Sequence, residues 1–451
     1  MQMDSGMEPQ DAGTDAGVAA RDLDIAVVKL RHDGTLDTSF GTGGKAILDF
    51  GAASGSARDS VYSFDVDAMG RVVLFGSTKG TGRTDVDRYV ARLSANGQLD
   101  TSFGVDGLHR LDLGGTNENA RHGFVQADGK IIAAGYTALP TGVPIEDGGV
   151  QTANTIVLLR LESNGAPDTT FGTDGLVKLN PFPSAMPATL PWGLCEAYAA
   201  VQQSGGRYVT VGYGRRAATG TVDLTSVRLD NMGVQDTTWA GTGAIVFDLI
   251  GGDERGRHAV ALADDRVVFV GSGTPLTGNI DALVSIVRAD GTPDTSFGTA
   301  GTKLYAFGRN DEAFFGSAVG PGGMTLAVAG YRVGAANNDQ ENDDAVLALI
   351  PLSTGAPAEI AQPVPLSTTT HDRFLGVAWD GAQVVAAGFV REGTDTKFAV
   401  ARFNADGTRD TTFGTGGLVT INTSMGGTEE VARWVKVLAD GSILLAGPVE
   451  H

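Results

Sequence analysis

The chain has 451 residues, of which 42% are hydrophobic and 65 are glycine, so it can bury a large core and form many tight turns. Its formal charge of -20 and pI of about 4.6 exclude nucleic acids and anionic membrane surfaces as expected partners, because both require a basic face. The single cysteine excludes an internal disulfide and a cysteine-based zinc site, and no apolar run approaches the roughly 20 residues that span a bilayer.

The two ends of the chain differ in composition from the rest. Residues 1–23 are acidic and small, with almost no apolar side chains, and we expect them to form a disordered tether. This segment resembles the spacer that follows the lipid-anchored cysteine of bacterial surface lipoproteins. We therefore expect the natural protein to begin before Met1, with an N-terminal lipid anchor. At the other end, we expect residues 448–451 to be a tail derived from a vector.

A short motif, Leu36-Asp37-Thr38-Ser39-Phe40-Gly41, follows the first predicted strand and precedes the second. We interpret it as a corner, in which Asp and Ser or Thr bond to nearby backbone amides and the aromatic ring is buried. Near-copies begin at Asp100, Asp168, Asp236, Asp294 and Asp410, at spacings of 63, 68, 68, 58 and 116 residues. The last spacing is twice 58, and a copy that has lost its Asp lies midway, at Ala358. Repeats at this period mark one supersecondary unit each, so we expect seven units.

Each unit contains four apolar runs separated by Gly and Asp turns, which predicts a four-stranded antiparallel meander. One such sheet has two apolar faces, and seven sheets arranged radially bury them against one another as a β-propeller. The chain opens with third and fourth strands (24–50) and closes with first and second strands (429–447). We therefore expect both ends to build the seventh blade, and the propeller to span residues 24–447.

The order of the strands within a blade follows from two prolines. Pro363 and Pro365 fall in the fourth strand of the unit with the degenerate motif. Since proline is tolerated chiefly at the edges of sheets, fourth strands should be outermost, and first strands should line the central channel.

The repeated segments resemble a known family. Residues 128–135, 90–97 and 36–41 together are similar to the delta repeat of about 60 residues, a β-propeller repeat of unknown function. The resemblance covers nearly everything from residue 24 to residue 447. It implies a propeller in a secreted or surface protein of delta-proteobacteria, and it implies no activity and no catalytic residues. The sequence departs from the pattern at Ala358, at Trp239-Ala240 in place of Phe-Gly, and at Asp265 in place of a turn Gly.

The two faces of the propeller should differ. The first-to-second and third-to-fourth turns carry the repeated motifs and form what we call the corner face. The opposite, variable face carries connections of unequal length, such as 137–153, 180–192 and 332–343, and we expect any binding site there.

Two columns of side chains recur in the first strands. Counting eight residues back from each turn Gly, or from Asp265 where the Gly is replaced, gives Tyr62, Arg121, Tyr198, Arg257, Phe315, Arg373 and Arg433. Three residues earlier stand Asp59, Glu118, Cys195, Glu254, Glu312, Thr370 and Glu430. Two interpretations stay open. Either the arginines and carboxylates pair within and between blades, or the arginines form a funnel that binds carboxylate, phosphate or sulfate groups.

In the second interpretation, Tyr62 and Tyr198 stack on a sugar or aromatic ring. The ligand-binding candidates are Tyr62, Tyr198, Arg121, Arg257, Arg373, Arg433, Asp59, Glu118, Glu254, Glu312 and Glu430.

Metal sites and nucleophiles have weaker patterns. His122, His258 and His371 suggest either a three-His metal site across the channel or packing against neighbouring blades. Asp339, Glu341 and Asp343 stand at alternate positions and suggest calcium, but a solvated acidic loop is the alternative, because the Gly and terminal Glu of an EF-hand are absent. Cys195 has no evident base, and we interpret it as a buried small residue.

Together these patterns predict an all-β, seven-bladed propeller that binds a ligand or serves as a scaffold outside the cytoplasm of a bacterium: secreted, on the outer surface or in the periplasm. Its partner would be a protein, an anionic glycan or a small anion at the variable face. The competing hypothesis is a hydrolase or lyase at the channel mouth, with Glu118, Glu254 or Glu312 as general acid or base and arginines holding charge. No cofactor is implied apart from the calcium candidate, and fold alone does not choose between these functions.

Overall fold

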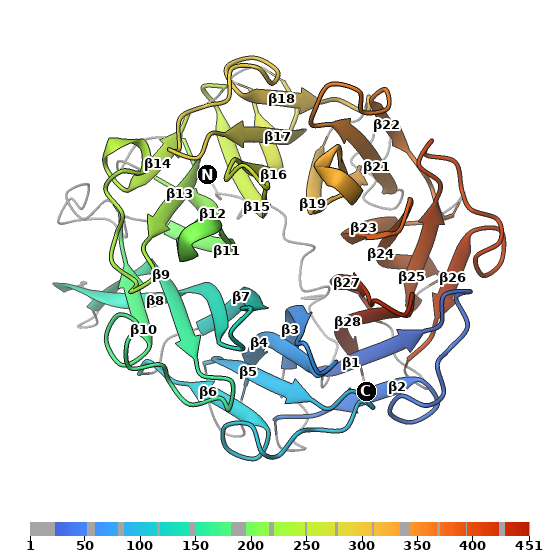
Figure 1. The fold of residues 1–451 in the computed structure, drawn as a ribbon, viewed down its shortest axis with the longest axis horizontal. Helices are drawn as coiled ribbons and strands as arrows, with labels where there is room; N and C mark the ends of the chain where they lie inside the picture. Colours follow the sequence, from blue (N-terminus) through green and yellow to red (C-terminus); the bar gives the residue numbers. More distant parts are fainter. Residues whose placement is uncertain are drawn as a thin grey trace.

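The computed structural model shows a seven-bladed β-propeller, in which seven four-stranded antiparallel sheets surround a central axis (Figure 1). The predicted fold is therefore confirmed. The residues that the structure describes are 23–51, 59–79, 85–114, 118–144, 150–181, 195–215, 221–248, 250–275, 278–308, 311–333, 343–367, 370–393, 395–423 and 429–450. Among them, no helix is long and apolar enough to cross a membrane.

In blades 1 to 6 the strands follow one another in chain order from the axis outwards (Figure 1). Blade 1 consists of β3 (Asp59–Val66), β4 (Val72–Thr78), β5 (Asp87–Leu93) and β6 (Leu108–Leu111). Blade 2 consists of β7 (Glu118–Val125), β8 (Ile131–Pro144), β9 (Val150–Leu161) and β10 (Leu176–Leu179). Blade 3 consists of β11 (Cys195–Gln202), β12 (Tyr208–Gly214), β13 (Asp223–Leu229) and β14 (Ala244–Phe247).

The remaining blades repeat this plan. Blade 4 consists of β15 (Asp253–Ala261), β16 (Val267–Thr274), β17 (Asp281–Val287) and β18 (Thr302–Tyr305). Blade 5 consists of β19 (Glu312–Val319), β20 (Thr325–Arg332), β21 (Asp344–Pro351) and β22 (Ile360–Pro363), and blade 6 of β23 (Asp372–Asp380), β24 (Gln383–Glu392), β25 (Asp395–Phe403) and β26 (Leu418–Ile421). Blade 7 consists of β27 (Trp434–Val437), β28 (Ile443–Glu450), β1 (Leu23–Leu30) and β2 (Lys45–Leu48).

Blade 7 closes the ring by joining the two ends of the chain, as the sequence predicts. Its order is β2-β1-β28-β27, and β1 pairs with β28 from Leu23 opposite Glu450 to Leu30 opposite Ile443. Residues 448–450, which we expected to form a tail, are thus the last part of a paired strand. Residues 1–22, which carry most of the expected tether, lie outside the described residues.

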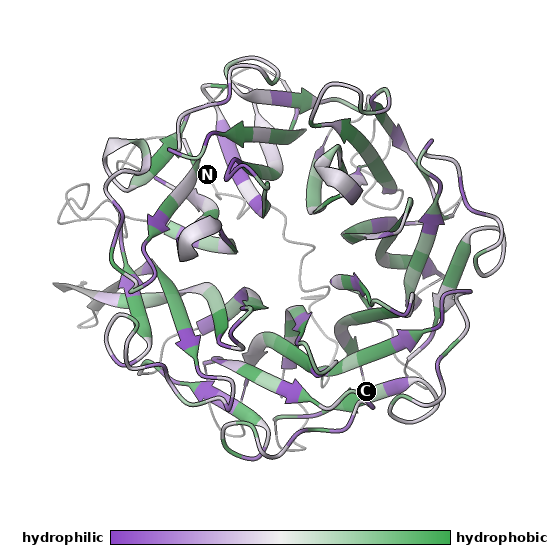
Figure 2. Cartoon of the chain, viewed as in Figure 1, coloured by the Kyte–Doolittle hydropathy of each residue, from purple (hydrophilic) through white to green (hydrophobic). Residues whose placement is uncertain are grey.

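The position of the fourth strands also agrees with the sequence. β22, which contains Pro363, lies at the outer edge of its sheet, and the first strands lie nearest the axis (Figure 1). Figure 2 shows that hydrophobic residues follow the strands of the blades. Neighbouring blades share apolar clusters, such as the one that joins Phe64 of β3 and Leu74 of β4 to Leu444 of β28. The core is therefore divided among the spaces between blades.

The repeated motif forms the predicted corner. In blade 1, Oδ1 of Asp100 accepts hydrogen bonds from the backbone N–H of Ser102 (3.1 Å) and from its hydroxyl (2.6 Å). The aromatic ring is fully buried in five of the copies, at Phe40, Phe103, Phe171, Trp239 and Phe413. Trp239 thus fills the place of the usual Phe. Its neighbour Ala240 has a φ of 49°, in the left-handed region where the other copies of the motif have Gly. Asp265, which replaces the Gly of the first turn in blade 4, is also left-handed, with a φ of 65°.

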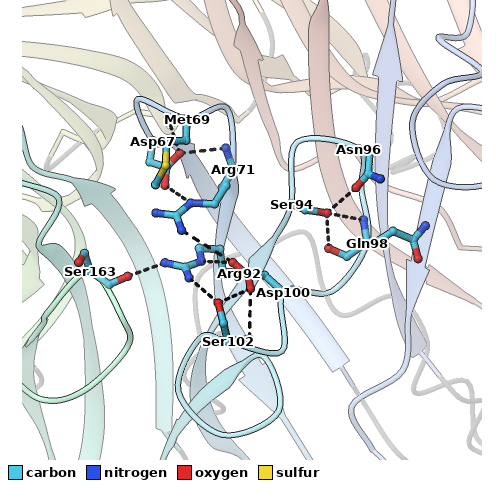
Figure 3. Close-up of polar contacts among 10 residues, drawn as sticks. All are labelled: Asp67, Met69, Arg71, Arg92, Ser94, Asn96, Gln98, Asp100, Ser102 and Ser163. Atoms are coloured by element: carbon cyan, nitrogen blue, oxygen red, sulfur yellow. Dashed lines mark hydrogen bonds and ion pairs between the residues drawn. The ribbon is translucent and has the colours of Figure 1, made fainter.

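An arginine links each of four corners to the next blade. Arg92 of β5 lies 2.8 Å from Oδ2 of Asp100 and donates to the carbonyl of Ser163 in blade 2 (Figure 3). It also stacks over Phe103 at 4.7 Å. We call this arrangement the Arg–Asp staple. It recurs with the pairs Arg160 and Asp168, Arg228 and Asp236, and Arg402 and Asp410, each reaching a carbonyl of the following blade.

Three corners are built differently. Blade 7 uses Lys29 at 3.2 Å from Asp37, and blade 4 uses Arg266, from its first turn, at 3.0 Å from Asp294. The motif of blade 5 has lost its Asp at Ala358. In five corners, those of blades 1, 2, 3, 6 and 7, a further backbone bond crosses to the next blade, as from Gly104 N to Asn164 O (2.8 Å). The motif is therefore the main connection between blades on the corner face.

Candidate functional site

Seven side chains, one from each first strand, form a ring around the axis. In six blades the pairing between the first and second strands shifts by one residue at Tyr62, Arg121, Tyr198, Arg257, Phe315 and Leu375. A β-bulge of this kind redirects a side chain out of the regular alternation. Arg433, just before β27, takes the place in blade 7. We call these seven residues the belt.

Six of the seven residues of the predicted column are in the belt, but Arg373 is not. In blade 6 the turn is shorter, so the turn glycine Gly381 follows the bulge at Leu375 by six residues, whereas eight separate Tyr62 from Gly70 in blade 1. Counting back from the turn Gly therefore misplaces the column by two residues, and Leu375 occupies the bulge. Arg373 instead bonds to the buried Asp343 and stacks over Tyr331 at 4.0 Å.

Arginine and aromatic rings alternate along the belt. The guanidinium carbon of Arg121 lies 4.3 Å from the ring of Tyr62 and 5.0 Å from that of Tyr198. Arg257 lies 4.8 Å from Tyr198 and 5.4 Å from Phe315, and Arg433 lies 5.3 Å from Tyr62. Seven is odd, so the alternation fails once, where Leu375 follows Phe315. Stacking on aromatic faces fixes the guanidinium planes, and Arg121 also donates to the hydroxyl of Tyr136 at 2.9 Å.

The channel is filled on the axis just below the belt. Three residues that each follow a belt residue, His122, His258 and Trp434, meet with ring centroids 5.0 to 5.3 Å apart. His122 Nδ1 accepts from Ala200 N at 3.4 Å, and His258 Nδ1 lies 2.7 Å from the hydroxyl of Ser317. Burial lowers the pKa of His122 to about 4 and that of His258 well below its usual value. We call this neutral aromatic cluster the plug.

The plug decides between the two interpretations of the histidines. His122 and His258 do converge across the channel, but Trp434 is the third member of the cluster. His371 lies elsewhere, with Nδ1 3.3 Å from Asp343. A site with all three His residues is therefore not formed, and the packing interpretation describes His122 and His258.

The belt and the plug together enclose a small bowl of about 70 Å³. The belt forms its wall, and His258 and Trp434 contribute to its floor. Since the plug residues lie farther along the first strands than the belt residues, the bowl faces the variable side of the propeller. Among the described residues, those that line it include three arginines and no acidic residue.

A second cavity of about 210 Å³, which we call the side pocket, lies between blades 4 and 5 and shares Arg257 and Phe315 with the bowl. A third, of about 290 Å³, lies on the corner face between blades 1 and 2. Its arginines are paired, Arg71 with Asp67 at 2.6 Å and Arg92 with Asp100 at 2.8 Å (Figure 3). The third cavity is therefore part of the stapling between blades.

The carboxylates of the second predicted column do not line the bowl. They are at most 1% exposed, and each accepts a hydrogen bond from the backbone of the connection that precedes its strand. The pairs are Asp59 with Gly51 (3.1 Å), Glu118 with Leu113 (2.8 Å), Glu254 with Ile250 (2.9 Å), Glu312 with Phe307 (2.9 Å) and Glu430 with Thr423 (2.8 Å). These five ligand-binding candidates therefore hold the connections between blades, and of the five only Glu312 also lines the side pocket.

In blade 6 the corresponding carboxylate is Asp372, not the expected column residue Thr370. Asp372 accepts from Ala345 N (2.8 Å) and Ser367 N (2.9 Å), and burial raises its pKa to about 6. A raised pKa means that the folded state holds its proton more tightly than the unfolded chain. The resulting stability is complete below about pH 3.8, the ordinary value, and is lost as the pH rises through 6.

We predict that this group alone costs the wild type up to about 3 kcal/mol of unfolding free energy between pH 4 and 7. Asp372→Asn removes the titration. Urea unfolding of both proteins at several pH values should therefore show the variant gaining stability relative to the wild type as the pH rises. A difference that is constant across this range would contradict the prediction.

Other acidic residues and the cysteine are placed as follows. Asp339 and Glu341 of the calcium candidate lie outside the described residues, and Asp343 is bonded to Arg373 and His371. Cys195 is buried, and its surroundings raise the pKa of the thiol to about 12, as expected for a packing residue.

The sequence reasoning missed two groups of carboxylates on the variable face. Their oxygens lie within 4.8 Å of one another, a spacing that a cation would fit. The groups are Asp85, Asp87 and Asp112, and Asp223, Asp248 and Glu254. Asp87 and Asp223 each begin the third strand of their blade, and this recurring Asp is a sequence signal that could have indicated the two groups.

A comparison with known families found a similar repeat. Residues 70–103, 147–171 and 380–413 match the family model described as a domain of unknown function (DUF5122) beta-propeller. Each matched segment ends on the aromatic residue of the corner motif, at Phe103, Phe171 and Phe413. The chain is similar to this family at three of its repeats. The match supports a propeller repeat of unknown function. A comparison with curated proteins gave no match.

Several solved structures are similar to this chain in part. Sqt1 from Chaetomium thermophilum is 11% identical, with 87% of this chain and 97% of that chain covered and a TM-score of 0.40. A polysaccharide lyase of family PL25, an ulvan lyase, is 12% identical, with 80% and 82% covered and a TM-score of 0.37. An acylaminoacyl peptidase of Pyrococcus horikoshii is 9% identical, with 84% and 47% covered and a TM-score of 0.39. These likenesses concern the fold alone.

Proposed function

We propose that the protein is a binding propeller whose axial bowl recognises an anionic group attached to a ring, as in an acidic sugar. The observation that carries the proposal is the composition of the bowl. Three arginines alternate with aromatic rings around it, and no acidic residue lines it among the described residues. This occurs in a chain with a net charge of -20.

The physical reason is the geometry of the guanidinium group. Its planar fork of N–H donors matches the two oxygens of a carboxylate, and the same oxygens on a sulfate or phosphate. Arg121 and Arg257 both stack against the ring of Tyr198, so their side chains are ordered before a ligand arrives. Less conformational entropy is then lost on binding. Tyr62 and Tyr198 also line the bowl, where an aromatic ring can contact the apolar part of a sugar.

A catalytic role is supported less well by the same residues. The carboxylates considered as general acid or base, Glu118, Glu254 and Glu312, are buried and accept backbone N–H groups. A group engaged in this way is not poised to move a proton to a ligand. We therefore propose binding, and with it the extracytoplasmic location and lipid tether that the N-terminal composition suggests.

The proposal is tested by thermal unfolding in the presence of sulfate, phosphate and glucuronate, with sodium chloride at equal ionic strength as the reference. A ligand that binds only the folded state raises the melting temperature in proportion to RT ln(1 + [L]/Kd). We expect at least one of these anions to raise it in the wild type but not in Arg121→Ala. Arg288→Ala, an exposed arginine on the corner face, is the matched control and should behave as the wild type. If every anion acts like chloride, or if Arg121→Ala responds fully, the proposal is wrong.

A further inference from the structure

The side pocket has a different chemistry from the bowl. It mixes basic, acidic and hydroxyl side chains, whereas the described residues that line the bowl include no carboxylate. Its charged side chains are Arg255, Arg257, Asp253, Asp311 and Glu312, and Ser272, Thr274 and Tyr331 supply hydroxyls. A single anion therefore has a clear place in the bowl, while in the side pocket the carboxylates of Asp253, Asp311 and Glu312 oppose the attraction of Arg255 and Arg257 for an anion.

Mixed donors and acceptors fit a neutral group that has many hydroxyls. Each sugar hydroxyl both donates and accepts, so it can donate to a carboxylate while accepting from a guanidinium or a hydroxyl side chain. The guanidinium carbon of Arg255 lies 5.6 Å from the ring of Tyr213, which holds it along the wall. Phe315 and Tyr331 stack at 5.6 Å and provide an aromatic surface for the apolar face of a sugar ring.

The two cavities adjoin at a shared wall. Arg257 and Phe315 line both. Neither volume, about 70 Å³ for the bowl and about 210 Å³ for the side pocket, reaches the roughly 300–1,000 Å³ of a typical small-molecule site. Added together, the two volumes come close to the lower end of that range. The bowl has room for a charged group, and the side pocket has room for a neighbouring ring.

We infer that the ligand is an acidic oligosaccharide in which an acidic unit is followed directly by a neutral one. This rests on the proposed function, since it places the carboxylate of the acidic unit at the belt. The neutral sugar occupies the side pocket, where its hydroxyls bind between Arg255 and the two aspartates. A chain that carries a charge on every unit fits poorly, because its second carboxylate lies against Asp253 and Asp311.

The test compares three probes by isothermal titration calorimetry at one salt concentration. They are glucuronic acid, disaccharides in which glucuronic acid is linked to a neutral hexose, and digalacturonic acid. We expect at least one mixed disaccharide to bind about tenfold more tightly than glucuronic acid, as a charge-assisted hydrogen bond gained in the side pocket would give. Digalacturonic acid should show no such gain.

Variants of the side pocket sharpen the test. Arg255→Ala should reduce the affinity for the mixed disaccharide to that of glucuronic acid. Asp253→Asn, whose amide oxygen keeps the bond from Val222 N, should raise the affinity for digalacturonic acid. Because Asp253→Asn is expected to raise an affinity, a general loss of folding cannot account for that result.

The outcomes separate the two proposals. If glucuronic acid binds but no mixed disaccharide binds more tightly, or if digalacturonic acid binds best, the inference is overturned and the proposed function stands. If neither these probes nor inorganic anions bind, the proposed function falls, and the inference falls with it.

Discussion

Replacing Arg402 with methionine should lower the free energy of unfolding by about 3–5 kcal/mol, the range expected when one partner of a buried ion pair is removed. Arg402 is 3% exposed and lies 2.7 Å from Asp410 and 3.3 Å from Asp380. It also donates to the carbonyl of His32 at 2.7 Å and stacks over Phe413. Methionine fills much of the volume but supplies no charge, so both aspartates and the carbonyl lose a donor.

The effect should be cooperative across the whole ring, because this staple joins blade 6 to blade 7, where the two ends of the chain meet. Urea unfolding followed by circular dichroism and by tryptophan fluorescence measures it. The matched control is Lys303→Met, which removes an exposed pair with Glu359 between blades 4 and 5, with side chains 39% and 30% exposed. That variant should change stability by less than about 0.5 kcal/mol. Equal losses in the two variants would show that the staple is no stronger than a surface ion pair.

The pH dependence gives a second check on the same staple. Hydrogen bonds from Thr412, together with Arg402, lower the pKa of Asp410 to about 2. A lowered pKa contributes stability above the ordinary value of 3.8 that is lost as the pH falls towards 2. The difference in stability between the wild type and Arg402→Met should therefore shrink as the solution is acidified below pH 4.

Much of this architecture can be predicted from the sequence because the corner motif is local. Asp100 and Ser102 are two residues apart, so their hydrogen bond follows from short-range geometry, and each copy marks one blade. The staple was missed although its signal was present. Arg92, Arg160, Arg228 and Arg402 each precede the motif Asp by eight residues. A constant spacing between an arginine and an aspartate predicts an ion pair, provided that the strand and the corner that carry them are known to be neighbours.

The candidate site was predicted less completely, for two physical reasons. One shorter turn in blade 6 moved Leu375 into the belt in place of Arg373, and spacing from a turn cannot reveal a change in the length of that same turn. The bulges then decide which side chains reach the axis. His122, His258 and Trp434 come from blades 2, 4 and 7, and only three-dimensional packing brings them together. Likewise, the partners of Glu118 and Glu254 are backbone amides, which leave no trace in a pattern of residue types.

Replacing Arg257 with methionine should weaken the binding of an acidic sugar by about 10- to 150-fold, the equivalent of one charge-assisted interaction of 1.5–3 kcal/mol. Arg257 is the one arginine that lines both the bowl and the side pocket. It is 6% exposed and held between Tyr198 at 4.8 Å and Phe315 at 5.4 Å. A mixed acidic and neutral disaccharide should therefore lose more affinity in this variant than in Arg121→Ala, since Arg121 lines the bowl alone.

Arg257→Lys distinguishes charge from shape. Lysine keeps the positive charge but offers no planar fork and stacks less well between two rings, so we expect an affinity between those of the wild type and Arg257→Met. Calorimetric titration with the tightest-binding probe gives the affinities, and melting temperatures show whether each variant is folded. Arg288→Met on the corner face is the control for a lost positive charge. If lysine restores full affinity, the belt acts as a simple positive charge and the stacked guanidinium planes are not needed; if methionine causes no loss, the ligand does not bind at the junction of the two cavities.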